Sequence, residues 1–282
     1  MSVPVLLPSG YAFNYTIRTT VEEADGDTQI KAEKLPSWLT LKDNGDGTAL
    51  LSGTTPKVSA VQTDEIEITA TNNNIVAKQN FSLKIKETVK VACVGNSITF
   101  GSMLSNRVKD CYPAQLSNML GEGFDVGNFG KSGATMLRNG DRPYVKQAEY
   151  TKAIDFEPDI VVIKLGTNDT KPMNWDGHKG EFKDDTNYLI EQFEKLSSTQ
   201  AVFMCTPCKV FSGGNYGITD EVVSGGVIPV LKEVVKERNM ELIDIYTVVS
   251  GHSECFQKDG VHPDAAGAKL IAEGICRVLL GK

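Results

Sequence analysis

The chain has 282 residues, with 40% hydrophobic and 23% charged side chains and a formal net charge of −7. The length allows two domains, and the composition is ordinary for a globular protein. Because Lys and Arg form no cluster, nucleic acid and anionic membranes are not expected as partners, and a neutral or weakly charged substrate is favoured. No apolar run reaches the roughly 18 residues that span a bilayer. Residues 1–10 lack the segments of a signal peptide, so none is predicted in this chain.

Residues 1–88 have the pattern of short β-strands. Apolar and polar side chains alternate within 11–17, 66–70 and 81–85, which is the period of half-buried strands. Turn-rich pieces separate these runs, namely EADGD, KDNGDG, SGTTPK and TNNN. We therefore predict a small antiparallel β-sandwich over 1–88. Asp25 and Asp27 are candidate calcium ligands, although a solvated turn is the favoured interpretation.

Beyond residue 88, strand-like and helix-like segments alternate. The apolar, strand-like runs lie at 89–95, 124–129, 159–166, 201–207 and 240–246. The helix-like stretches lie at 111–121, 146–155, 185–198, 226–238 and 264–280. This alternation indicates parallel β-α-β units with a sheet buried on both faces. Residues 89–282 are therefore predicted to form a doubly wound α/β domain, whose site should lie at the carboxyl ends of its strands.

Residues suited to acyl transfer follow the predicted strands directly. Ser97 follows the first strand, Gly130 the second and Asn168 the third, while His262 stands just before the last helix. Histidine as a residue type titrates near neutrality, with a pKa of about 6.5, as a general base must. Asp259 lies three residues before His262, so its carboxylate could orient the imidazole.

An oxyanion would need hydrogen-bond donors beside this nucleophile. The backbone N–H groups of Ser97 and Gly130 and the side-chain amide of Asn168 are the candidates. Glycine at 130 would let a substrate approach the backbone closely.

Each of these segments also has an ordinary structural interpretation. A serine after a strand is commonly a helix N-cap, GTND (166–169) could be a simple turn, and DGVHPD (259–264) could only start the last helix. Of the other histidines, His252 is expected in a surface turn, and His178 is expected in a polar loop where it could line a pocket. The four segments together, all at one edge of the same sheet, favour a catalytic site.

Six cysteines lie at positions 93, 111, 205, 208, 255 and 276. Cys205 and Cys208 form a single C-x-x-C pair without a second pair at zinc spacing, so no metal site is predicted. Buried thiols are the favoured interpretation, and one disulfide among the later cysteines is the alternative.

Four segments resemble, in this order, the sequence blocks of the SGNH (GDSL-type) hydrolase family. They are VGNSITFG (94–101), NFGKSGAT (128–135), GTND (166–169) and DGVHPD (259–264). The resemblance covers about residues 89–281. It implies a three-layer, flavodoxin-like, doubly wound parallel sheet.

The resemblance also implies a role for each matching residue. Ser97 would be the nucleophile, His262 the base and Asp259 its partner, as in a Ser-His-Asp carboxylic ester hydrolase. The oxyanion hole would be formed by Ser97, Gly130 and Asn168. Neither a metal nor an organic cofactor is implied.

Two residues outside these roles are further candidates for substrate contact, Asn96 and Trp175. Asn96 stands where the family usually has Asp. This departure is expected to affect only the local support of the loop that carries Ser97. The alternative lipase signature G-x-S-x-G is not met, because Thr99 replaces its last glycine.

Residues 1–88 resemble an immunoglobulin-like module of the cadherin/dystroglycan type. The matching pieces are ADGDTQI (24–30), LPSWLTL (35–41), LSGTTP (51–56) and NFSLKIK (80–86). The resemblance implies that Trp38 is a core residue, and it implies a secreted or periplasmic location.

The substrate is predicted from what surrounds these blocks. The family includes carbohydrate O-acetylesterases, lysophospholipases, thioesterases and lipases. The segment after GTND is polar with one aromatic, Trp175, which could stack on a sugar or simply pack, and no long apolar stretch offers a lid or tunnel. We therefore expect a serine esterase that removes acetyl groups from a carbohydrate. A lysophospholipase or thioesterase-type acyl hydrolase and a catalytically inert extracellular binding protein are the alternatives.

Overall fold

The computed structural model describes residues 6–20, 28–211 and 215–281. The chain divides into two compact units, Met1–Val89 with Arg277–Lys282 and Lys90–Cys276, here called the β-unit and the α/β-unit. Asp25 and Asp27, the candidate calcium ligands, lie outside the described residues. None of the described helices combines the length and the apolar character needed to cross a membrane.

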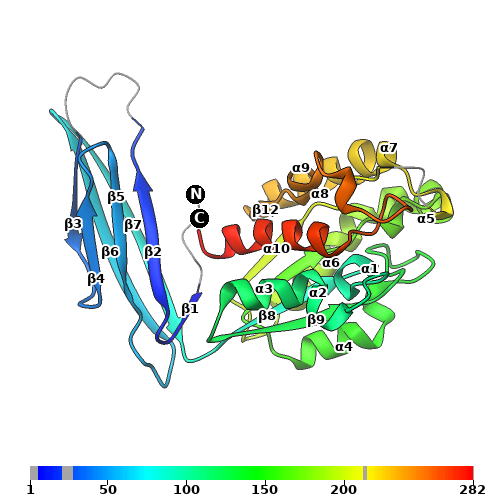
Figure 1. Cartoon of the computed structure of the whole chain (residues 1–282), viewed down its shortest axis with the longest axis horizontal. Helices are drawn as coiled ribbons and strands as arrows, with labels where there is room; N and C mark the ends of the chain where they lie inside the picture. The colour runs from blue at the N-terminus through cyan, green and yellow to red at the C-terminus, as the bar shows by residue number, and fades with distance from the viewer. Residues whose placement is uncertain (1–5, 21–27, 212–214, 282) are drawn as a thin grey trace. The chain divides into compact units, whose positions relative to one another are not determined.

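The β-unit is a sandwich of two sheets (Figure 1), with strand orders β1-β7-β6-β3 and β2-β5-β4. The β1–β7 pairing is parallel, whereas the other pairings are antiparallel. The sequence predicted only antiparallel pairing, but no hairpin joins the distant strands β1 and β7, so nothing imposes that direction. The strands are β1 Leu6–Pro8, β2 Ala12–Arg18, β3 Gln29–Lys34, β4 Leu39–Asp43, β5 Thr48–Thr54, β6 Gln62–Asn72 and β7 Ile75–Lys86.

The predicted alternation of apolar residues builds the core of the sandwich. Phe13 and Tyr15 of β2 are buried in one cluster with Ile66 and Ile68 of β6. Trp38 is only partly buried against this cluster, and its Nε1–H donates to Asp64 at 2.6 Å. The indole therefore has the partner that a buried N–H requires.

Part of the predicted turn SGTTPK is a strand. Ser52 and Gly53 belong to β5 and pair with β2 on one side and β4 on the other. A Cβ on Gly53 would lie 2.0 Å from the Trp38 carbonyl oxygen. The glycine here permits a close approach of two backbones, and it does not mark a turn.

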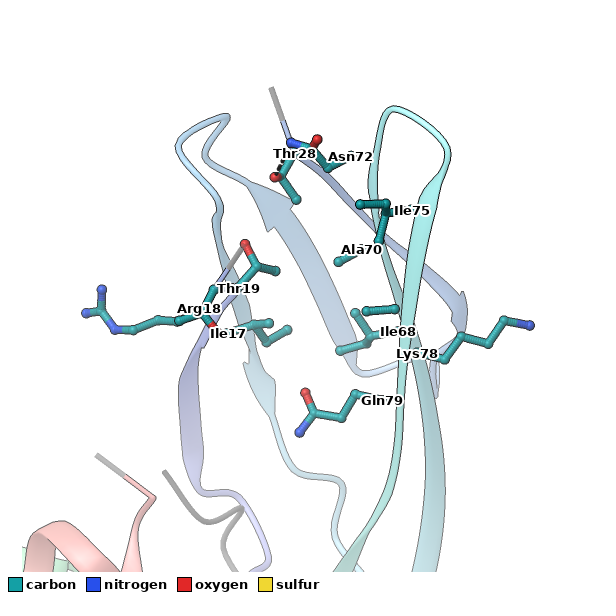
Figure 2. Close-up of a pocket in the computed structure, with 12 residues that line it drawn as sticks. Ile17, Arg18, Thr19, Thr28, Ile68, Ala70, Asn72, Ile75, Lys78 and Gln79 are labelled. Atoms are coloured by element: carbon teal, nitrogen blue, oxygen red, sulfur yellow. Dashed lines mark hydrogen bonds between the residues drawn. The ribbon is translucent and has the colours of Figure 1, made fainter. Parts of the chain in front are cut away.

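A cavity of about 920 Å³ opens in the β-unit. Ile17 of one sheet and Ile68 and Ala70 of the other line it, and Asn72 donates to Thr28 at its rim (Figure 2). Two further lining residues, the charged Arg18 and Lys78, point away from the space between the sheets (Figure 2). The described lining includes no Ser, Cys or His, so this cavity lacks the groups that acyl transfer needs.

The α/β-unit contains a five-stranded sheet with the order β12-β11-β10-β8-β9. In chain order this is the 2-1-3-4-5 arrangement of flavodoxin-like folds, with its switch point between β8 and β10. The pairings β8–β10, β10–β11 and β11–β12 are parallel. The fold class is thus the predicted one. The strands are β8 Val89–Gly95, β9 Phe124–Gly130, β10 Ile160–Lys164, β11 Ala201–Cys205 and β12 Leu242–Ile243.

The five predicted helices are all present and cover both faces of this sheet. Apolar residues of α4, α6 and α8 share one core cluster with alternate residues of β8, β10 and β11. On the other face α3 lies beside α10, where Gln115 donates to the Ala265 carbonyl oxygen (Figure 1). The helices are α3 Tyr112–Leu120, α4 Ala148–Asp155, α6 Phe182–Glu194, α8 Ile228–Glu237 and α10 Ala265–Leu279.

Local hydrogen bonding overrides the pattern-based prediction in one strand. Only Leu242–Ile243 of the predicted strand 240–246 is extended, because the Asp244 side chain accepts from Thr247 N–H and caps a helix, α9. The sequence pattern also did not predict several short helices. They are α1 Ser97–Phe100, α2 Arg107–Asp110, α5 Pro172–His178, α7 Asp220–Val222, α9 Ile245–Val249, a π-helix at Val223–Val227, and 3₁₀ turns at Tyr144–Lys146, Asn168–Thr170, Lys179–Glu181, Asn215–Gly217 and Ser253–Cys255.

All six cysteines are free thiols. Four are buried, whereas Cys255 and Cys276 are half-buried. Burial raises the pKa of the Cys205 thiol to about 12, so this group is an inert part of the core.

Candidate active site

Ser97 is positioned by a tight turn between β8 and α1. Asn96 caps the helix, since its side-chain oxygen accepts from Ile98 N–H at 3.0 Å. Its side chain is fully buried and does not line the cavity described below. Asn96 therefore shapes the turn that carries Ser97, and its role as a substrate contact stays a prediction.

Glycine at position 95 makes this turn possible. A Cβ there would lie 2.0 Å from Thr99 Oγ1 and 2.7 Å from the Lys164 carbonyl oxygen. Thr99 in turn hydrogen-bonds Tyr112 OH at 3.1 Å. The first turn of α1 is thereby packed against both the end of β10 and α3, which fixes where Ser97 points.

Ser97, His262 and Asp259 form one chain of hydrogen bonds. Ser97 Oγ lies 2.8 Å from His262 Nε2, and His262 Nδ1 lies 2.6 Å from Asp259 Oδ2. An ionised carboxylate only accepts hydrogen bonds, so Nδ1 carries the proton and Nε2 accepts from the serine hydroxyl. This is the arrangement a nucleophile and its general base require.

Asp259 is held in the ionised form. Its other oxygen, Oδ1, accepts from the backbone N–H groups of Val261 and His262, both at 3.0 Å. Partial burial raises the pKa of Asp259, but the hydrogen bonds from His262 and from these backbone groups outweigh it, so the net pKa is below the ordinary value. The carboxylate is therefore charged at neutral pH.

The loop that carries Asp259 and His262 is closed on itself. Gln257 N–H donates to the His262 carbonyl oxygen at 2.7 Å, and Phe256 forms an isolated β-bridge with Pro263. The whole loop therefore presents the base and the carboxylate as one unit.

Asn168 lies beside the nucleophile at the carboxyl end of β10. Its Nδ2 donates to the Ala134 carbonyl oxygen at 3.1 Å, and the residue is 6% exposed and lines the cavity. A primary amide carries two N–H groups. One of them fixes the side chain, which leaves the other for an oxyanion.

Gly130 has a packing role that the sequence did not indicate. A Cβ on this residue would lie 2.1 Å from Phe100 N, so the glycine allows β9 to pack against α1. Gly130 is not among the residues lining the cavity, and its N–H donates to Asn128 Oδ1 at 3.0 Å. Its part in an oxyanion hole stays a prediction and would require this N–H to be shared.

The triad opens into a cavity of about 480 Å³. Besides the triad, Thr167 and Asn168, its lining includes Ser102, Ser132, Gly133, Asp141, Arg142 and Lys171. The lining also includes Met173, Tyr216, Ile218 and Val261. The cavity therefore offers a small reaction space whose lining combines hydrogen-bonding and apolar groups.

Several of these lining residues were missed because no sequence pattern marks them. Lys171 donates to Asp141 Oδ2 at 2.9 Å, and Arg142 Nη1 donates to the Ser132 carbonyl oxygen at 2.9 Å. Tyr216 comes from a short turn more than 40 residues further along the chain. The one signal in the sequence that could have indicated a lining residue is that Lys171 closely follows GTND (166–169).

Asp169, the last residue of GTND, supports the site from behind. Its carboxylate accepts from Leu137 N–H at 2.8 Å and from Met136 N–H at 3.1 Å, and it is fully buried. Burial raises the pKa of Asp169 to about 6, even though these backbone hydrogen bonds lower it. The residue thereby ties the GTND segment to the loop after β9.

Trp175 does not line the catalytic cavity. Its ring packs on Phe182 with a centroid distance of 5.6 Å, and a Cβ on Gly226 would lie 2.6 Å from it. Of the two interpretations of Trp175, stacking on a sugar and packing within the protein, the structure shows packing. His178 and His252 pair with nearby glutamates and also lie outside the cavity.

A group of metal-capable side chains occurs elsewhere in the described chain. His252, Glu254 and Cys255 place their donor atoms within 4.8 Å of one another. None of the three lines the catalytic cavity. The described residues hold no other group of this kind.

The chain matches two known families. Residues 93–270 match the GDSL-like Lipase/Acylhydrolase family. Residues 2–86 match the family described as "Putative Ig domain". The first match includes every residue of the hydrogen-bonded triad.

Similar proteins include esterases of bacterial origin. An acetylxylan esterase from Xylanibacter ruminicola is 37% identical over 211 residues, which are 69% of this chain and 44% of that protein. A multidomain esterase from Ruminococcus flavefaciens is 26% identical over 166 residues, covering 53% of this chain and 20% of that protein. The chain thus spans less than half the length of these curated relatives.

A solved structure shares the fold of the α/β-unit. The crystal structure of a lipase/acylhydrolase from Enterococcus faecalis is 26% identical, with a TM-score of 0.53. The similarity covers 69% of this chain and 96% of that chain.

Proposed function

The chain belongs to the GDSL-like lipase/acylhydrolase family, and we propose on this premise that it is a serine esterase that removes acetyl groups from a carbohydrate. The observation that carries the proposal is the hydrogen-bonded chain from Ser97 Oγ through the His262 ring to Asp259. It lies at the carboxyl ends of the strands, where doubly wound sheets place their ligands.

In the proposed reaction, Ser97 Oγ attacks the ester carbonyl carbon while His262 Nε2 takes the hydroxyl proton. Asp259 keeps Nδ1 protonated and stabilises the imidazolium that forms. His262 then gives its proton to the leaving alcohol, and the C–O bond of the ester breaks. A water molecule repeats the sequence on the acyl-enzyme and releases the acid.

The tetrahedral oxyanion is held by fixed N–H groups in this proposal. The Ser97 N–H and the second N–H of Asn168 act together with a Gly130 N–H that is shared with Asn128. Support comes from Asn168, because its side chain is already oriented by the Ala134 carbonyl before substrate binds. A donor that needs no reorganisation stabilises the transition state most effectively.

Two observations favour an acetyl ester of a carbohydrate as the substrate. The relative at 37% identity is an acetylxylan esterase by name, and the cavity lining includes hydroxyl, amide, carboxylate and cationic groups. Such groups can bind an alcohol with many hydroxyl groups. The immunoglobulin-like match over 2–86 supports a further proposal, that the protein is secreted or periplasmic. Immunodetection in fractions of the native host would test this location.

The first test is hydrolysis of 4-nitrophenyl esters of rising acyl length, with Ser97→Ala beside the wild type. We expect fast cleavage of the acetate, a steep fall for longer chains and no activity in the variant. Equal or better cleavage of the octanoate would instead indicate a lysophospholipase or thioesterase. Absence of any activity above the Ser97→Ala background would overturn the esterase proposal and leave an inert binding protein.

A further inference from the structure

Tyr216 stands in the wall of the catalytic cavity with 81% of its surface exposed. The exposed ring lines the same cavity as Ser97 and His262, so a ligand in this cavity can contact it. An aromatic face that opens onto a cavity is suited to a flat apolar surface of a ligand.

The backbone at this ring has an unusual conformation. Tyr216 has φ 65° and ψ 22°, the left-handed conformation that side-chain-bearing residues rarely adopt. The next residue, Gly217, also has a positive φ, and a Cβ on it would lie 2.8 Å from Pro172 Cδ. The turn is thus seated against the residue that follows Lys171. Such strain persists where the surroundings enforce it and is concentrated at ligand sites.

A fixed cation lies near the ring. Lys171 Nζ is 5.6 Å from the Tyr216 ring centroid and donates to Asp141 Oδ2 at 2.9 Å. Asn174 holds the same carboxylate, since its Nδ2 donates to Asp141 Oδ1 at 2.9 Å. The Lys171 side chain is only 9% exposed, so its ammonium group is held in place at the cavity wall. Both members of the ion pair line the cavity, where a ligand can contact them.

We propose that Tyr216, Lys171 and Arg142 form the subsite that binds the sugar ring bearing the ester. A pyranose ring presents an apolar face of C–H groups and a rim of hydroxyl groups. The Tyr216 ring packs against the C–H face, while the ammonium of Lys171 and the guanidinium of Arg142 donate to hydroxyl oxygens. An arginine has five N–H donors, and Arg142 directs one of its nitrogens to the Ser132 carbonyl oxygen. The inference rests on the proposed esterase function and deepens it by assigning recognition of the alcohol part to Tyr216, in place of Trp175.

The test measures the hydrolysis of acetylated xylotriose. Tyr216→Ala should lower kcat/KM about tenfold, mainly through KM, as expected for loss of one aromatic contact. The value of kcat should stay close to that of the wild type, because the reacting groups are unchanged. Tyr216→Trp should restore the activity on xylotriose. Tyr188→Ala is the matched control. The Tyr188 ring also has a cation over it, with Arg138 Cζ 4.4 Å from the ring centroid, but Tyr188 lines a different cavity.

A loss confined to kcat, or no loss on acetylated xylotriose, would overturn the subsite. A binding measurement separates this result from failure of the proposed function. Calorimetry of xylotriose with Ser97→Ala, which does not require turnover, should give a Kd that weakens about tenfold on adding Tyr216→Ala. Failure of Ser97→Ala to bind xylotriose would overturn the inference even where 4-nitrophenyl acetate is cleaved.

Discussion

The lining of the catalytic cavity has two parts, here called the catalytic wall and the recognition wall, and these are built in different ways. On the catalytic wall, Ser97 follows β8, Asn168 follows β10, and Asp259 and His262 share one loop whose backbone bonds to the carboxylate. On the recognition wall, Asp141, Lys171 and Tyr216 come from separate segments and are joined by side-chain contacts. The proposed reaction geometry is therefore set by the backbone of the sheet. The proposed recognition of the substrate depends instead on a few side chains whose replacement should leave the sheet intact.

The largest effect is expected for Asp259→Asn on the catalytic wall. An amide at this position favours the wrong imidazole tautomer, so kcat for 4-nitrophenyl acetate should fall roughly 10⁴-fold. The measurement is steady-state kinetics, with circular dichroism to show that the fold is retained. A fall of less than about tenfold would mean that His262 does not depend on Asp259.

Asn168→Ala should come next, with a loss of about 10²–10³-fold in kcat and little change in KM. The reason is that an oxyanion donor acts on the transition state and not on the bound ester. Ser132→Ala is a suitable control, because Ser132 lines the same cavity without an assigned part in catalysis. An effect of Asn168→Ala confined to KM would remove Asn168 from the oxyanion hole.

A third experiment measures how the contribution of Asp169 to stability depends on pH. Because the folded pKa of Asp169 is raised to about 6 from 3.8, its contribution to stability is complete below about pH 4 and is lost as the pH rises to about 6. Asp169→Asn does not titrate. The free energy of unfolding of the wild type, relative to this variant, should therefore fall by about 3 kcal/mol from pH 3 to pH 7. Urea unfolding of both proteins at several pH values measures this difference in the free energy of unfolding. A difference that does not change with pH would contradict the prediction.

The smallest effect is expected on the recognition wall. Removing the ion pair with Asp141→Asn and Lys171→Met together should lower kcat/KM for acetylated xylotriose about tenfold. Changing both residues avoids leaving either charge without its partner. Activity on 4-nitrophenyl acetate should be retained. A parallel loss on both esters would show that the two walls are not independent.

The same contrast explains what the sequence could predict. Ser97, Asn168 and the Asp259–His262 loop could be found because strand ends converge at one edge of a parallel sheet. The fold class followed from the same alternation of elements. Trp175 was a candidate by residue type alone, and its packing on Phe182 depends on a contact between two helices. Tyr216 could not be found, because its place beside Lys171 arises from a turn seated on Pro172.

The closed loop that carries Asp259 and His262 has a consequence for motion. The bonds from Val261 and His262 N–H to Asp259, and from Gln257 N–H to the His262 carbonyl, all lie within six residues. A fluctuation that shifts this loop therefore moves base and carboxylate together as a rigid body and changes mainly the separation between Nε2 and Ser97 Oγ. The imidazole stays correctly polarised throughout, and each opening simply disconnects the nucleophile. We therefore expect the average activity to be proportional to the fraction of time for which the loop is closed.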